Sequence, residues 1–263
     1  MSRPVTLGYA VSTVEGRLLQ NSVFIDQLNS LEAPVVIVNQ FKYRQIDQRS
    51  FKEHIRIINT QTKGLSISRN MALSSLESEF AMLCDDDIKL EMQNIPKLES
   101  ALEAECDIAM FFTQLQKSTG ELWRKDYEAN PFYLKKLSVR TRRRIQRINS
   151  MEQVYNVSFL KVNNLQFNEY FGVGSQRYIQ GEETLMSLSV LRASGTLKYL
   201  PLVTRVHPPF SSGHHLSIEH LKANLAVQII TFGPLGLLSF SSYVLRSLIR
   251  YARNAMSGKH LKG

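Results

Sequence analysis

Two short, unbroken apolar runs, Val35–Val38 and Phe80–Cys84, restrict the folds that this 263-residue chain can adopt. Apolar stretches of this length are typical of strands covered on both faces, as in a parallel sheet. Amphipathic segments separate the runs, and Gly16–Leu31 repeats apolar residues at helical spacing. This alternation predicts a doubly wound α/β sheet with right-handed crossovers.

The same patterns continue along the chain. We expect further strands at Val5–Val11, His54–Asn59, Asp107–Thr113, Val154–Phe159 and Leu197–Val206, and helices at Ser68–Glu77 and Glu182–Ser194.

Composition limits the partners and the compartment. The chain has 32 Lys and Arg against 23 Asp and Glu, a net charge of +9. This excess favours anionic partners such as nucleotide phosphates, lipid headgroups or nucleic acid. Two cysteines cannot build a disulfide scaffold, and the N-terminus lacks the basic and apolar regions of a signal peptide. We expect a cytoplasmic, globular enzyme.

Three consecutive acids, Asp85, Asp86 and Asp87, directly follow the run Phe80–Cys84. In open parallel sheets, ligands bind at the carboxyl ends of strands. Neighbouring carboxylates repel one another unless a cation is close, and Mg²⁺ or Mn²⁺ prefers such oxygen ligands. The triplet therefore indicates a metal and phosphate site, with a solvated acidic turn as the alternative.

A second polar segment lies one helix upstream of the acids. Gly64 precedes a predicted helix that Ser66 or Ser68 could cap. Arg69 would add a positive charge to its first turns, and a capped helix N-terminus beside an arginine is suited to binding an anion. A simple cap with a surface arginine is the alternative.

Two adjacent acids, Glu182 and Glu183, begin a later predicted helix. Because neighbours in a helix cannot share a face, we expect one to point into a cleft and the other to hold the loop or the helix N-terminus. A carboxylate directed at a substrate hydroxyl is the usual form of a general base. Acids that only favour the helix N-terminus are the alternative.

In their order along the chain, these motifs resemble those of family 2 glycosyltransferases of the GT-A fold. The resemblance covers Val5 to Gly213 and rests on Ser12-Thr13, the run Val35–Gln40, Gly64 with Arg69-Asn70, Asp85–Asp87, Glu182-Glu183 and His207. It implies a catalytic domain over residues 1–215 with a mixed, mainly parallel sheet flanked by helices. Residues 216–263 would form a C-terminal helical extension.

The resemblance also implies roles for individual residues. Ser12, Thr13, Asn39, Gly64, Arg69, Asp85 and Asp86 would bind the nucleotide-sugar, and Asp87, Asp85 and His207 would bind Mn²⁺ or Mg²⁺. Glu183 would deprotonate the acceptor hydroxyl with Glu182 in support, and attack opposite the leaving group would invert the anomeric carbon. Asn39 and Gln40 stand where the family often has an aspartate that reads the base, so both a UDP- and a GDP-sugar remain candidates.

Two other functions compete with this one. A nucleotidyl- or phosphoryl-transfer enzyme would carry similar acids, but no Gly-rich phosphate loop lies between Leu7 and Arg17. A non-catalytic basic module would bind a membrane or nucleic acid. We favour transfer of a sugar to a glycan or lipid-linked acceptor in surface polysaccharide synthesis, with no nucleic acid as partner.

The C-terminal segment Ala223–Leu245 contains no charged residue. It is long enough to span a bilayer, but Gly233 and Pro234 interrupt a straight helix. An amphipathic helical hairpin, in the membrane interface or packed on the domain, fits better, with the following arginines at the headgroups. We expect peripheral attachment to the inner face of the cell membrane. The basic stretch Lys135–Arg147 would contact acceptor phosphates or a membrane, or form a solvated helix face.

Overall fold

The structure is a computed structural model that describes residues 5–209 and 217–245. The predicted domain boundary near residue 215 and the arginines that follow residue 245 lie outside the described residues.

In the described chain, one sheet of nine strands has the order β3-β2-β1-β4-β8-β6-β9-β5, and β7 pairs with β9. The strands are β1 (Leu7–Val14), β2 (Val35–Gln40), β3 (Ile55–Thr60), β4 (Phe80–Asp85), β5 (Lys89–Leu90), β6 (Met110–Lys117), β7 (Phe132–Leu134), β8 (Gln153–Asn156) and β9 (Leu197–His207). Strands β1 to β4 pair in parallel, as do β6 and β9, while β8 runs antiparallel between β4 and β6. The sheet is therefore mixed and mostly parallel, as predicted.

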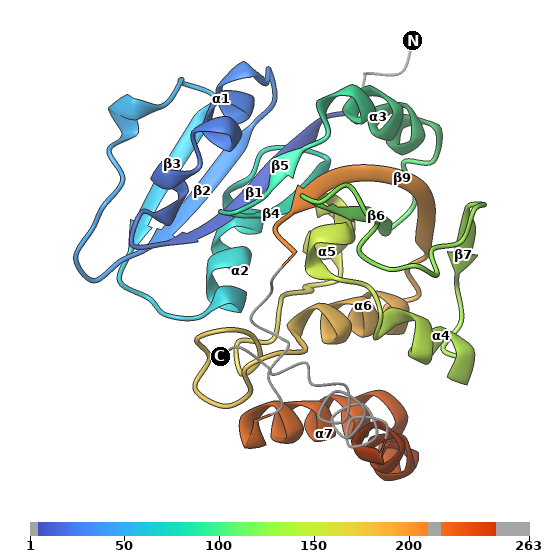
Figure 1. The fold of residues 1–263 in the computed structure, drawn as a ribbon. Helices are drawn as coiled ribbons and strands as arrows, with labels where there is room; N and C mark the ends of the chain where they lie inside the picture. Colours follow the sequence, from blue (N-terminus) through green and yellow to red (C-terminus); the bar gives the residue numbers. More distant parts are fainter. Residues whose placement is uncertain (1–4, 210–216, 246–263) are drawn as a thin grey trace.

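Helices cover both faces of the sheet (Figure 1). They are α1 (Ser22–Ser30), α2 (Leu65–Ser75), α3 (Ile95–Ala104), α4 (Val139–Ile145), α5 (Val157–Val162), α6 (Glu182–Arg192) and α7 (Ile218–Phe232). Short 3₁₀ turns include η1 (Arg17–Gln20), η4 (Ser150–Glu152) and η6 (Gly233–Leu235). Helices α2, α5 and α6 lie along one side of the sheet, and α7 lies beyond α6, away from the strands (Figure 1).

Two asparagines end predicted elements early, because their side chains cap helices. Asn156 accepts a hydrogen bond from the amide of Phe159, so the predicted strand Val154–Phe159 ends at Asn156 and α5 begins. Asn21 accepts from the amide of Phe24 and divides the predicted helix Gly16–Leu31 into η1 and α1.

Strand register brings three carboxyl ends together. Ser12 of β1 lies beside Val38 of β2 and Asp85 of β4, and Thr13 lies beside Asn39. Chain order reverses here, because β2 and β3 lie on one side of β1 and β4 lies on the other. Such a switch point is where open α/β sheets bind ligands.

The C-terminal segment forms the predicted helical hairpin. A Cβ on Gly236 would lie 2.4 Å from the carbonyl oxygen of Gln228, so the chain after η6 folds back against α7. Ile218–Leu245 has the length and composition of a membrane span, with hydropathy 1.5, but it is interrupted at Gly233. Two side chains bind α7: Gln146, directly after α4, bonds to Gln228, and Arg192 of α6 donates to the carbonyl of Ile230. The arm formed by α7 is thus packed on the domain.

Gly181 fixes how closely α7 approaches the start of α6. Its φ is +102°, and a Cβ there would lie 2.3 Å from Cγ2 of Val227. We expect Gly181→Ala to lower the free energy of unfolding by about 3 kcal/mol, from backbone strain plus overpacking, as measured by urea denaturation. Gly120→Ala is the control, since Gly120 has φ +90° and open space around it; it should cost about 1 kcal/mol. Equal losses in the two variants would contradict the packing of α7 on Gly181.

Candidate active site

Asp86, in the middle of the acidic triplet, is committed to internal contacts. Its carboxylate accepts a hydrogen bond from the Thr13 hydroxyl at 2.7 Å and lies 3.4 Å from the guanidinium of Arg17. Burial raises the pKa of Asp86, although the Thr13 and Arg17 contacts oppose that shift. Asp86 and Thr13, both predicted to bind the nucleotide-sugar, join the ends of β4 and β1 in this structure.

Asn39, predicted to bind the nucleotide-sugar, is used inside the protein in this structure. Its side chain is 0% exposed, its Oδ1 accepts from the amide of Gly16, and its Nδ2 donates to Asn59 and to the carbonyl of Arg44. Because both ends of the amide are occupied, Asn39 holds the loops after β1 and β2. It offers no free group to a base.

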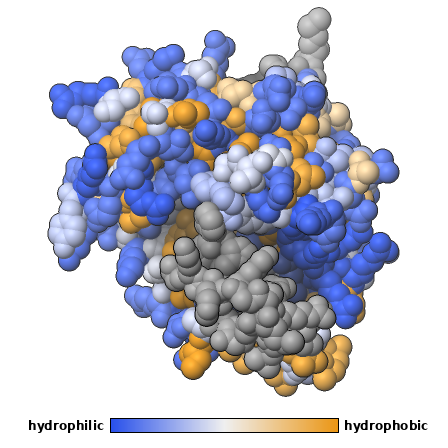
Figure 2. Space-filling view, viewed as in Figure 1, coloured by the Kyte–Doolittle hydropathy of each residue, from blue (hydrophilic) through white to orange (hydrophobic). Residues whose placement is uncertain are grey.

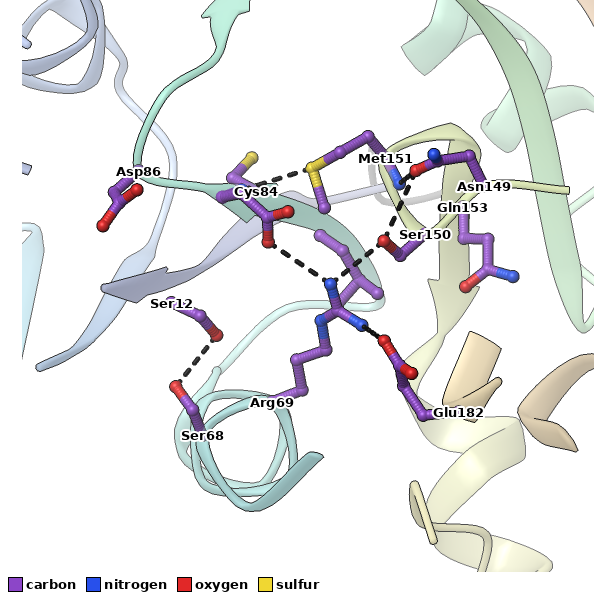
Figure 3. A network of polar contacts seen from close by, with 12 residues as sticks. Ser12, Ser68, Arg69, Cys84, Asp86, Asn149, Ser150, Met151, Gln153 and Glu182 are labelled. Atoms are coloured by element: carbon purple, nitrogen blue, oxygen red, sulfur yellow. Dashed lines mark hydrogen bonds and ion pairs between the residues drawn. The ribbon is translucent and has the colours of Figure 1, made fainter. Parts of the chain in front are cut away.

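Arg69 is the centre of a buried polar network (Figure 3). Its guanidinium is 2% exposed and donates to Glu182 at 2.9 Å, Ser150 at 3.0 Å and Asp85 at 3.3 Å. Asp85 and Glu182 raise the pKa of Arg69, against the effect of its burial. In this arrangement the guanidinium of Arg69 is occupied by side chains of the protein, and its predicted contact with the nucleotide-sugar stays a prediction. Arg69 ties the end of β4 to the start of α6.

The loop before α6 contacts the N-terminus of α2, where the anion site was predicted. The amide of Leu65 donates to the carbonyl of Val173, and the Ser66 hydroxyl donates to the carbonyl of Phe171. Neither Ser66 nor Ser68 caps the helix, because Gly64 is the N-cap residue. Gly64, at φ +126°, lets the loop before α6 lie against α2.

Asp87 and His207 face each other at the ends of β4 and β9. Their Oδ1 and Nε2 atoms are 3.4 Å apart, and Oδ1 of Asp87 is buried with no hydrogen-bond partner among the described residues. Nδ1 of His207 lies 2.7 Å from the carbonyl oxygen of Pro208, which can only accept, so Nδ1 carries the proton. Trp123 packs edge-on against the imidazole, with ring centroids 5.2 Å apart.

With the Nδ1 proton directed at Pro208, Nε2 of His207 is left facing Oδ1 of Asp87. A cation between them would satisfy both, and a histidine whose other nitrogen donates to a carbonyl is the usual form of a metal ligand. The pair fits Mg²⁺ or Mn²⁺, which often take one or two protein ligands and substrate phosphates. Within the described ranges, no group of three or more His, Cys, Asp or Glu side chains could hold a metal. Asp85, the third predicted ligand, pairs with Arg69.

Glu182 and Glu183 take different directions, as the sequence predicted. Glu182 is buried and pairs with Arg69. It also lies close to Gly172, because a Cβ added to Gly172 would be 3.2 Å from the carboxyl carbon of Glu182. Glu183 lines a cavity of about 920 Å³ bounded by α4, the start of α6 and the C-terminal hairpin. Loss of hydration and the neighbouring charge of Glu182 raise the pKa of Glu183 to about 8, despite the opposing charge of Arg69. When ionised, a carboxylate in this place can accept a proton from a group bound in the cavity.

The polar support beneath Arg69 was not predicted from the sequence. Asn149 and Glu152 form a capping box around η4, and this turn presents Ser150 to Arg69. Glu152 is fully buried, bonded to Arg124 and Tyr127, and burial raises its pKa to about 7. The spacing Asn-x-x-Glu is a capping signal that could have revealed the turn. The partners of this turn, Arg69, Arg124 and Tyr127, are too distant in the sequence to be predicted from residue spacing.

Solved structures similar to this one have the GT-A architecture. The crystal structure of S. aureus TarS 1-349 superposes with a TM-score of 0.62 and 13% identity, covering 85% of this chain and 64% of that one. S. aureus TarS superposes with a TM-score of 0.61 and 14% identity, covering 85% of this chain and 39% of that one. TarS 1-349 in complex with UDP-GlcNAc superposes with a TM-score of 0.60 and 14% identity, covering 85% of this chain and 66% of that one. The chain thus spans less than two thirds of the length of these structures.

Sequence comparison identifies the family of the chain, in addition to its fold. The family model for glycosyl transferase family 2 matches residues 31–165, just over half of the sequence. The chain belongs to glycosyl transferase family 2. No curated protein matches it with significant sequence similarity.

Proposed function

We propose that this protein transfers a sugar from a nucleotide-sugar donor to an acceptor hydroxyl, with inversion at the anomeric carbon. The observation that carries the proposal is the partly buried Glu183, which lines a large cavity and whose pKa is raised. The carboxyl ends of β1 and β4, where Ser12 and Asp85 lie side by side, form the neighbouring donor side. TarS 1-349 binds UDP-GlcNAc and UDP in solved structures, which supports a UDP-sugar as donor.

Each side chain has a distinct task in this reaction. Asp87 and His207 would hold a divalent cation, which when bound supplies Lewis-acid stabilisation of the departing diphosphate. Glu183 accepts the proton of the acceptor hydroxyl, and attack from its side gives inversion. Arg69 bonds to both Asp85 and Glu182 and so keeps the donor edge and the base in fixed relation.

The hairpin supports attachment to the inner face of a cell membrane. Apolar side chains of its turn and second arm are exposed, among them Leu235, Leu237 and Leu238. Figure 2 has hydrophobic residues along the lower edge of the molecule, where Figure 1 draws α7. Exposed apolar side chains on a basic protein are suited to an anionic lipid surface. In this proposal the acceptor is a glycan or a lipid-linked glycan of a surface polysaccharide.

A panel of nucleotide-sugars tests the donor side directly. We expect one UDP- or GDP-sugar to raise the melting temperature in the presence of Mn²⁺ and not in EDTA, because a ligand that binds only the folded state stabilises it. At a concentration of 100 Kd the gain is about 2.7 kcal/mol. NMR of the product then gives its anomeric configuration. Retention would reject the proposed role of Glu183, and no response to any nucleotide-sugar would favour a non-catalytic module.

A further inference from the structure

The cavity that contains Glu183 has three helical walls and one polar floor. Helix α4 and the residues after it supply one wall through Val139, Arg143 and Arg147, which recur at helical spacing. Helix α7 supplies the second through Val227 and Phe232. The second arm of the hairpin supplies the third, and the start of α6 with Glu183 forms the floor. If Glu183 is the base of the proposed function, the acceptor must occupy this cavity.

Four arginines in α4 or directly after it divide into two groups. Arg142 donates to the carbonyl of Thr231, and Arg144 pairs with Glu128, so both fasten α4 to its surroundings. Arg143 and Arg147 line the cavity instead. Among the described residues Arg143 has no acidic partner, and the acid that pairs with Arg147, Asp126, is itself half exposed. Two guanidinium groups one helical turn apart therefore face the space into which Glu183 also points.

This charge pattern selects an anionic ligand. Guanidinium groups recognise phosphate oxygens through paired hydrogen bonds, and two of them can hold one phosphate or diphosphate from two sides. Among the described residues that line the cavity, Glu183 is the only acid. A phosphate at the arginines would lie on the α4 wall, which leaves the floor for the reacting hydroxyl.

The walls from α7 and the second arm mix polar side chains with an apolar strip that continues to the surface; the polar ones are Asn224, Gln228, Ser239, Ser242 and Tyr243. Leu235 and Leu238 line the cavity and are still 62% and 70% exposed. They join the exposed apolar surface of the hairpin, which includes Leu237 and Leu245. A ligand made only of sugars and phosphates would not bury this surface, whereas an alkyl or isoprenoid chain would.

We infer that the cavity binds an acceptor in which a phosphate or diphosphate links the sugar to an alkyl or isoprenoid chain. The phosphate contacts Arg143 and Arg147, the chain runs over Leu235 and Leu238, and the sugar hydroxyl reaches Glu183. This inference rests on the proposed function for the role of Glu183. The chemical class of the ligand is inferred separately: the two arginines indicate a phosphate, and the exposed leucines indicate an apolar chain.

Binding of simple probes to the full chain in EDTA tests the inference without turnover. We expect farnesyl diphosphate to bind, measured by calorimetry, and farnesol and inorganic diphosphate to bind at least about tenfold more weakly. The double variant Arg143→Ala, Arg147→Ala should weaken farnesyl diphosphate at least about tenfold. Lys136→Ala, Arg140→Ala is the matched control, because it removes the same charge at exposed positions outside the cavity; its affinity should stay within about twofold of the parent.

Three outcomes would overturn the inference: farnesol binding as tightly as farnesyl diphosphate, inorganic diphosphate binding as tightly, or the control variant losing as much affinity as Arg143→Ala, Arg147→Ala. Equal binding of inorganic diphosphate would assign the cavity to a water-soluble phosphorylated acceptor. A separate titration with UDP-sugars and Mn²⁺ distinguishes the two proposals. If UDP-sugars bind and farnesyl diphosphate does not, only this inference fails. If farnesyl diphosphate binds and no nucleotide-sugar does, the proposed function fails.

Discussion

Replacing Glu183 with glutamine is expected to reduce sugar transfer by about 10²–10⁴-fold, the range associated with loss of a general base. Glutamine keeps the size of the side chain and can fill the same place at the cavity floor, but it cannot accept a proton at neutral pH. Donor binding should remain, because Glu183 lies at the start of α6 and the proposed donor site is at the carboxyl ends of β1 and β4. Nucleotide-sugar affinity and the rate of transfer, measured on the same preparation, separate these effects.

The pH profile adds a second readout for Glu183. Burial and Glu182 raise its pKa to about 8, and the base must be ionised to act. Therefore kcat/KM of the parent should rise with pH through a midpoint near 8 and level off above it, since kcat/KM reports the pKa of the free enzyme. Glu183→Gln should lack this rise in its residual activity. If Glu183→Gln kept both the parent's rate of transfer and its rise in kcat/KM with pH, Glu183 would be excluded as the base.

The sequence predicted the framework because strands buried on both faces leave a local signal. The runs at Val35 and Phe80 identified β2 and β4, and the acids after β4 placed the candidate site at the carboxyl edge of the sheet. Likewise, adjacent acids cannot share a helix face, and this was enough to predict that Glu182 and Glu183 point apart. Each of these inferences uses only neighbours in the chain.

What the sequence could not give were the partners of the polar side chains. Arg69 and Asn39 looked available for a ligand, but Arg69 pairs with Glu182, which is 113 residues away, and Asn39 bonds to the loops around it. A buried guanidinium or amide must find hydrogen-bond partners, and in this fold the protein supplies them. The two cavity arginines could not be separated from their neighbours either, because only the position of α7 distinguishes Arg143 from Arg142.

Asp87 is the other residue whose replacement should nearly abolish turnover. We expect Asp87→Asn to weaken Mn²⁺ binding in the presence of a nucleoside diphosphate by more than about 100-fold, since even changes to residues behind a metal ligand cost 10–100-fold. The physical reason is the buried Oδ1 of Asp87, which has no hydrogen-bond partner in the described chain and faces Nε2 of His207 at 3.4 Å. An amide of the same shape keeps the packing but removes the negative charge that a hard cation requires.

Manganese EPR measures this affinity independently of activity, and Asp86→Asn is the comparison variant. Asp86 lies next to Asp87, but its carboxylate is occupied by Thr13 and Arg17. Loss of charge there should lower stability through those contacts and leave Mn²⁺ affinity within a few-fold of the parent. If Asp86→Asn weakened Mn²⁺ binding as much as Asp87→Asn, the cation would be held by the charge of the whole triplet. The pair formed by Asp87 and His207 would then not be its site.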